Sequence, residues 1–179
     1  MRAMKRGVIR GRRLLLRKPR RLRSGGVIGI AAPASPFDRE SFDRGVQVLH
    51  DMGFETMIPD GLSAAEGYLA GPDGHRAAVL QQLFEDAHID AIICARGGYG
   101  SMRILPLLDY DQIAAHPKVF VGFSDVSALL SVITRRCGFV GVLVTLGLYL
   151  LAPMPNLAAT PTLMQVAASP MITYCPASR

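Results

Sequence analysis

The sequence is short of cysteine, and it lacks an apolar segment long enough to cross a lipid bilayer. Cys94, Cys137 and Cys175 are odd in number and form no C-x-x-C pair, which fits a reducing compartment and argues against a metal or redox centre. The largely apolar stretch Phe139–Ala152 has fourteen residues, whereas a transmembrane helix needs about 20. Leu14–Leu16 is too short to form the core of a signal peptide. We therefore expect a cytoplasmic protein with no cofactor, no metal and no membrane partner.

Acidic residues are absent from both ends of the chain. None occurs before Asp38 or after Asp125, while eleven of the 20 lysines and arginines fall in residues 1–23. Residues 24–179 carry nine basic and 14 acidic residues, so this part of the chain is acidic. The net charge of +6 therefore comes from residues 1–23. This distribution argues against a nucleic-acid partner. We expect residues 1–23 to be a disordered, dispensable leader; a basic arm that touches RNA or an anionic membrane is the alternative.

Short apolar runs alternate with segments of helical periodicity through the body of the chain. The runs are almost continuously apolar, which is typical of parallel strands that are covered on both faces. The sequence thus predicts an α/β fold in which a parallel sheet is flanked by helices. Strands are expected at Val27–Ala31, Phe54–Ile58, Asp90–Ala95, Val119–Gly122 and Val140–Thr145, helices at Ser41–Met52, His75–Glu85 and Val126–Thr134, and buried side chains at Ile28, Ile30, Ile92, Ile93, Val119 and Val121.

Loops that follow parallel strands meet at one edge of the sheet, where ligands bind. The expected loops are Ala32–Phe37 (APASPF), Arg96–Ser101 (RGGYGS) and the dipeptide Ser124-Asp125. The glycine-rich loop matches neither the phosphate-binding P-loop nor G-x-G-x-x-G, so a nucleotide site is weakly supported. A simple turn is the alternative for that loop.

Ser124 lies in KVFVGFSDVSALL, where an expected strand runs directly into an expected helix. One interpretation is that Ser124 or Asp125 caps the helix by accepting a backbone N–H, which is the ordinary role of these residues there. The other is a nucleophile elbow, although Val126 replaces the second glycine of the G-x-S-x-G pattern. The local residues leave both interpretations open.

Four segments together resemble the N-terminal domain of the LD-carboxypeptidases, a family of serine peptidases. They are IGIAAPASPF, GYLAGPDGHRAAVL, DAIICARGGYGSMRILPLLDY and VFVGFSDVSALL, in that order. The resemblance implies a Rossmann-like or glutamine-amidotransferase-like α/β domain over residues 24–145. It also implies that Ser124 is the nucleophile, that the backbone N–H groups of Gly98 and Asp125 form the oxyanion hole, and that the substrate is a murein peptide that loses its terminal D-alanine.

The sequence departs from this family beyond the elbow. The resemblance implies that a Glu and a His from a C-terminal domain complete the catalytic triad, yet no acidic residue follows Asp125 and no histidine follows His116. We interpret residues 146–179 as an atypical tail, such as a frameshift or an early stop would produce, with the C-terminal domain missing. The chain is therefore expected to be inactive. A non-catalytic fragment or a domain that binds a small molecule or peptide is the alternative, and a homodimer is left open.

Overall fold

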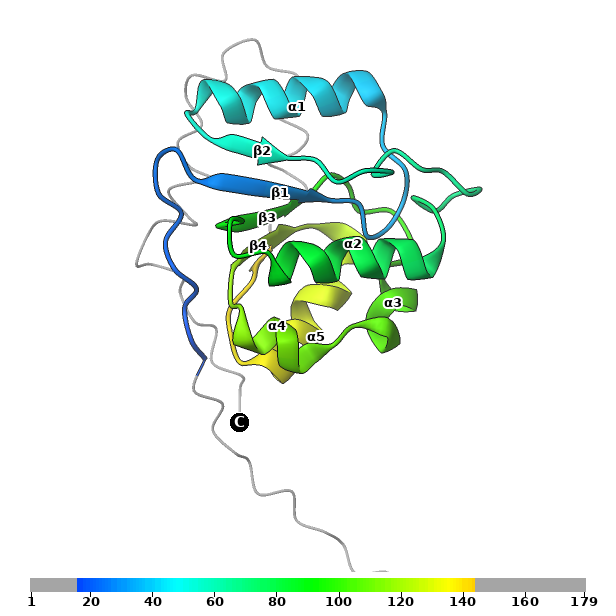
Figure 1. Ribbon diagram of the computed structural model, residues 1–179. Coiled ribbons are helices and arrows are strands. Elements are labelled where there is room, and N and C mark those ends of the chain that lie inside the picture. The colour runs from blue at the N-terminus through cyan, green and yellow to red at the C-terminus, as the bar shows by residue number, and fades with distance from the viewer. Residues whose placement is uncertain (1–15, 144–179) are drawn as a thin grey trace, which may run out of the picture.

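The computed structural model describes residues 16–143, which form one parallel sheet with helices on both faces (Figure 1). The tail at residues 146–179 and the leader up to residue 15 lie outside the described residues. The strands are β1 (Val27–Ala31), β2 (Glu55–Met57), β3 (Ala91–Cys94), β4 (Val119–Gly122) and β5 (Val142–Leu143). The helices are α1 (Arg39–Asp51), α2 (Asp73–Glu85), α3 (Ser101–Ile104), η1 (Leu105–Leu107), α4 (Tyr110–Ala115), η2 (Ser124–Val126) and α5 (Ser127–Cys137).

The strand order is β2-β1-β3-β4-β5, and every neighbouring pair is parallel. The chain moves outward from β1 to β2 and then returns past β1 to build β3, β4 and β5. Because parallel crossovers are right-handed, this reversal puts α1 on one face and α2, α4 and α5 on the other, as Figure 1 shows. The order therefore changes direction between β1 and β3, which is where α/β sheets of this topology open a crevice for ligands.

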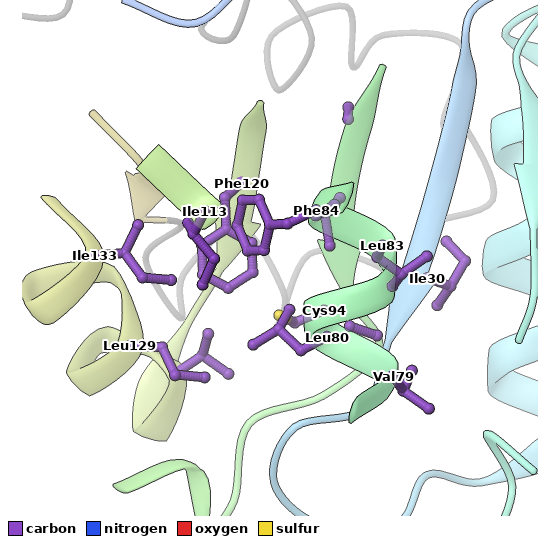
Figure 2. Packing of buried hydrophobic residues seen from close by; sticks show 14 of the residues in the cluster. Ile30, Val79, Leu80, Leu83, Phe84, Cys94, Ile113, Phe120, Leu129 and Ile133 are labelled. Atoms are coloured by element: carbon purple, nitrogen blue, oxygen red, sulfur yellow. The ribbon is translucent and has the colours of Figure 1, made fainter. Parts of the chain in front are cut away.

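The core lies mainly between the sheet and α2. Phe84 of α2 contacts Phe120 of β4 edge to face, with ring centroids 5.5 Å apart, and both side chains are fully buried. Figure 2 shows this pair beside Leu80 and Leu83 of the same helix. Gly29 of β1 makes the close approach possible, because a Cβ there would lie 2.6 Å from Cδ2 of Leu83. This packing fixes α2, and therefore its first turn, above the carboxyl edge of the sheet.

Two of the six side chains that were expected in the core are only partly buried. Ile28, Ile30, Ile92 and Val119 are buried as predicted, whereas Ile93 and Val121 are partly exposed. Ile93 and Val121 are paired in register and point to the face opposite Phe84. The expectation was wrong for them because that face carries α1, which packs mainly on β2.

The expectation of disorder was wrong for residues 16–23, the part of the leader that the structure describes. The N–H of Arg17 donates to Gly138 O at 2.8 Å, and Arg17 forms an isolated parallel bridge with Phe139. The Arg17 guanidinium also donates to Ala114 O at 2.9 Å, and Leu22 is buried. The end of the basic segment thus packs against the domain, because its backbone pairs with the segment after α5 and Leu22 adds to the core.

Candidate active site

Two loops meet at the switch point between β1 and β3. The N–H of Ser35, in the loop after β1, donates to Gly97 O in the loop after β3, at 3.3 Å. The Ser35 hydroxyl accepts the N–H of Tyr99 at 3.1 Å, and Arg96 Nη1 donates to Pro36 O at 3.0 Å. These bonds make the segments predicted as separate loops, Ala32–Phe37 and Arg96–Ser101, into a single hydrogen-bonded unit.

The pairing of Ser35 with Gly97 orients the N–H of Gly98. The Gly97 carbonyl and the Gly98 N–H belong to one trans peptide unit, so they point in opposite directions. Since the carbonyl faces Ser35, the N–H of Gly98 faces away from the loop after β1. Gly98 itself is exposed, whereas Gly97 and Gly100 are buried. The peptide unit that carries the Gly98 N–H is therefore held in a defined direction, and Gly98 is an exposed residue.

Ser124 occupies a strained turn directly after β4. Its φ is +54°, and it is the only residue other than glycine with a positive φ among residues 16–143. A non-glycine residue in such a conformation typically costs about 1–3 kcal/mol and is found where surrounding structure holds it, often at active sites. The Ser124 side chain is exposed, and neither η2 nor α5 has a side-chain cap hydrogen bond. The strand-to-helix turn is confirmed, and the capping alternative has no bond to support it.

Gly97 lets the glycine-rich loop lie directly against this turn. A Cβ at Gly97 would stand 2.8 Å from the Cβ of Ser124, 2.9 Å from Phe123 O and 3.3 Å from the Ser124 hydroxyl oxygen. Backbone and Cβ atoms cannot move aside as a flexible side chain can. The residue next to the predicted donor Gly98 must therefore be glycine if the loop is to contact Ser124.

Asp125 joins the elbow to the start of α3. Its Oδ2 accepts the N–H of Ser101 at 2.8 Å, and its carbonyl accepts the Ser101 hydroxyl at 2.6 Å. Ser101 is fully buried. The N–H of Asp125 lies in the first turn of η2, where backbone N–H groups have no acceptor within the helix. Ser124 and Asp125 thus lie in one turn, and Gly97, the residue before Gly98, lies against that turn.

Histidines do not take part in this arrangement. All four histidines of the chain lie in the described range, and each ring nitrogen that forms a hydrogen bond does so away from Ser124. No side chain of residues 16–143 forms a hydrogen bond with the Ser124 hydroxyl. The ring contacts are His50 with Thr56 Oγ1 at 2.9 Å, His75 with Gly61 O at 3.2 Å, His88 with Asp86 Oδ1 at 3.1 Å and His116 with Gln112 O at 3.0 Å.

The two described cysteines are part of the packing and not of the site. Cys94 and Cys137 are free and buried. Burial raises the pKa of the Cys94 thiol far above its usual range and raises the pKa of Cys137 to about 11. Both thiols are therefore protonated at neutral pH, and neither acts as a nucleophile. Among residues 16–143, no group of three or more His, Cys, Asp or Glu could hold a metal ion, and no helix is long and apolar enough to cross a membrane.

Sequence reasoning missed three residues that shape the site: Ser35, Arg76 and Ser101. Arg76 had a visible signal, because it precedes Val79 and Leu80 by three and four positions and so shares their helix face. A charged residue on a buried face indicates a specific set of partners. Ser35 and Ser101 had no comparable signal, since small polar residues are common in any loop.

Comparison with known proteins points to the same family as the sequence motifs. The sequence pattern of the LD-carboxypeptidase N-terminal domain matches residues 28–144. The chain is 38% identical over 123 residues to a probable murein peptide carboxypeptidase of Bacillus subtilis, covering 69% of this chain and 39% of that protein. It is 35% identical over 112 residues to the murein tetrapeptide carboxypeptidase of Pseudomonas aeruginosa, covering 62% and 36%.

A solved structure of the microcin C7 self-immunity protein MccF superimposes on the same region. The TM-score is 0.66 at 33% sequence identity, and the match covers 71% of this chain and 38% of that one. The chain therefore spans about two fifths of the length of the curated relatives it matches.

Proposed function

Because the chain belongs to the LD-carboxypeptidase family, we propose that residues 24–145 form the nucleophile-bearing half of a serine carboxypeptidase site. Ser124 is the nucleophile in this proposal, and the N–H groups of Gly98 and Asp125 stabilise the oxyanion. The substrate is a murein peptide, and the bond attacked is the amide before its terminal D-alanine. The observation that carries the proposal is the strained, exposed Ser124 against Gly97, beside the oriented N–H of Gly98.

The chemistry of each part follows from ordinary acyl transfer. The Ser124 hydroxyl attacks the scissile carbonyl, and the carbonyl oxygen becomes an oxyanion that the two backbone N–H groups stabilise. Since these donors are held by other bonds of the loop, they do not need to reorganise as the charge develops. A serine hydroxyl is a weak nucleophile at neutral pH, so a general base must also accept its proton.

Among residues 16–143, which include all four histidines of the chain, no base is bonded to Ser124, because each histidine has another partner. We therefore propose that the chain alone binds the peptide without cleaving it efficiently. Loss of a triad member typically lowers turnover by a factor of about 10⁴ to 10⁶. The free thiols of Cys94 and Cys137 support a reducing compartment such as the cytoplasm.

The proposal is tested by titrating isotope-labelled chain with a murein tetrapeptide and following backbone amide signals by NMR. We expect the signals of Gly97–Ser101 and Asp125 to shift with the tetrapeptide. The matched tripeptide, which lacks the terminal D-alanine, should shift them less. A tetrapeptide that leaves these amides unmoved, or that perturbs the amino edge of the sheet instead, would refute the proposed site.

A further inference from the structure

Arg76 is a buried cation that no part of the proposed chemistry uses. It lies in the first turn of α2, and its side chain has no exposed surface. Removing a guanidinium from water is costly unless its donors are all well satisfied. A charge that touches no substrate and yet stays buried therefore needs a structural reason.

The guanidinium forms hydrogen bonds with three separate loops at the carboxyl edge. Its Nη1 donates to Pro33 O and also to Gly100 O, the latter at 3.0 Å. Its Nε donates to Gly71 O at 3.1 Å, and its Nη2 bonds to the Asp73 carboxylate. The planar fork of an arginine is suited to such a divided set of acceptors, whereas a lysine offers a single point charge.

Two of these carbonyls flank the predicted oxyanion donor. Pro33 lies two residues before Ser35, whose backbone and hydroxyl bind Gly97 and Tyr99. Gly100 ends the other loop, the one after β3, with φ of +110°. Arg76 therefore bonds the loop after β1 to the loop after β3, at a point two residues beyond Gly98.

The charge of Arg76 is balanced within the same cluster. Asp73 accepts Arg103 Nη2 at 2.8 Å as well as Arg76. The hydrogen bond from Arg103 is the main reason that the pKa of Asp73 is lowered below its usual value. Asp73 thus stays ionised at neutral pH and balances the buried charge of Arg76.

We infer that Arg76 is a positioning residue, which sets the direction of the Gly98 N–H by tying Pro33 and Gly100 to one guanidinium. The role of Gly98 in catalysis rests on the proposed function. The ordering of the loop does not, so the two can be tested separately.

Lys118 provides a matched control at the other edge of the sheet. It is also a buried cation, it donates to the carbonyls of Leu83 (2.9 Å) and Asp86, and it immediately precedes β4. Replacing either cation by methionine leaves backbone carbonyls without a donor. Only Arg76→Met removes donors from carbonyls at the candidate site. An effect that both variants share is therefore a general loss of stability, and an effect of Arg76→Met alone is a loss of loop order.

The experiment compares the full chain with Arg76→Met, Arg76→Lys and Lys118→Met by amide NMR and hydrogen exchange. We expect Arg76→Met to shift the Gly98 signal and to speed exchange of Gly97–Ser101 at least about tenfold, since their opening becomes local. Arg76→Lys should move the same signals by a smaller amount, because it keeps the charge but not the fork. Lys118→Met should leave them in place and affect residues 83–89 instead.

The inference is overturned if Arg76→Met and Lys118→Met change the Gly97–Ser101 amides equally, or if neither changes them. If Arg76→Met does not fold, the same Gly97–Ser101 amides are measured in Arg76→Lys. If the tetrapeptide fails to bind but Arg76→Met alone speeds exchange of Gly97–Ser101, the proposed function fails and the inference stands. If the tetrapeptide binds but Arg76→Met does not speed this exchange, only the inference fails.

Discussion

Two pairs of glycines at opposite edges of the sheet have different roles. At the amino edge, Gly25 and Gly138 have positive φ angles, and a Cβ at either one would meet nothing within 4 Å. At the carboxyl edge, a Cβ on Gly97 or Gly98 would press against Ser124 or Ser35. The first pair serves only to turn the chain. The second pair serves close approach between loops, and the strained Ser124 lies on the same edge. Among residues 16–143, the only positive φ outside glycine therefore lies at the edge where Gly97 and Gly98 hold two loops together.

The largest effect is expected from Gly98→Ala compared with Gly138→Ala. Both positions have positive φ, which costs an alanine about 1–2 kcal/mol. At Gly98 the new Cβ would also lie 2.6 Å from the Cβ of Ser35, and overpacking adds about 1–3 kcal/mol. Urea unfolding should therefore show a loss of about 2–5 kcal/mol for Gly98→Ala and about 1–2 kcal/mol for Gly138→Ala. Equal losses would mean that Gly98 and Gly138 do not differ in packing.

A smaller effect is expected when Ser124 is replaced by glycine and, separately, by alanine. In ordinary helix and strand interiors, glycine is less stable than alanine by about 0.5–1 kcal/mol. At Ser124, where φ is +54°, the order should reverse, with Ser124→Gly more stable by about 1 kcal/mol. Chemical denaturation of the two variants measures the difference. An alanine variant that is the more stable of the two would show that the turn holds no strain.

At an open position in α1, Gly45→Ala should stabilise the fold. Gly45 is a helical glycine, and a Cβ added there would meet nothing within 4 Å. Alanine is favoured over glycine in a helix interior by about 0.8–1 kcal/mol, so the unfolding midpoint should rise by a corresponding amount. A lower midpoint would mean that α1 makes a close contact at this position.

The smallest effect concerns pH. The pKa of Asp73 is lowered, first by its bond from Arg103, and that of Asp86 is lowered by the N–H of His88. A carboxyl group whose pKa is lowered by folding stabilises the folded state at pH values above its unfolded pKa of 3.8. This stabilisation is lost as the pH falls through the folded pKa. Asp73→Asn and Asp86→Asn should each flatten the decline in stability below about pH 4. Only Asp73→Asn should also speed amide exchange in Gly97–Ser101. Faster exchange there in Asp86→Asn, and not in Asp73→Asn, would contradict the link between Asp73 and these loops.

The sequence predicted the strands better than the layers around them. The bounds of Val27–Ala31 and Val119–Gly122 agree residue for residue, because each strand is an uninterrupted apolar run. The exposure of Ile93 and Val121 could not be read from such a run, since it depends on which helices cover that face. The short helices between Ser101 and Ala115 were not predicted, because elements of three to six residues have too little periodicity to detect.

The candidate site was only partly predictable for a similar reason. Ser124, Gly98 and Asp125 were named from the resemblance of local motifs, and these motifs are short and contiguous. The burial of Arg76 arises from the convergence of Pro33, Gly71 and Gly100 on one guanidinium. These residues are far apart in the chain, so no local pattern could reveal that they meet.

The most direct test of the proposed site follows D-alanine release from a murein tetrapeptide by the full chain, with and without added imidazole, beside Ser124→Ala. We predict essentially no release by the chain alone, because no base among residues 16–143 is bonded to Ser124. We predict a slow release when imidazole supplies that base, and this release should disappear in Ser124→Ala. Release that is the same in Ser124→Ala would contradict the role of Ser124. Rapid release without imidazole that depends on Ser124 would contradict the absence of a base.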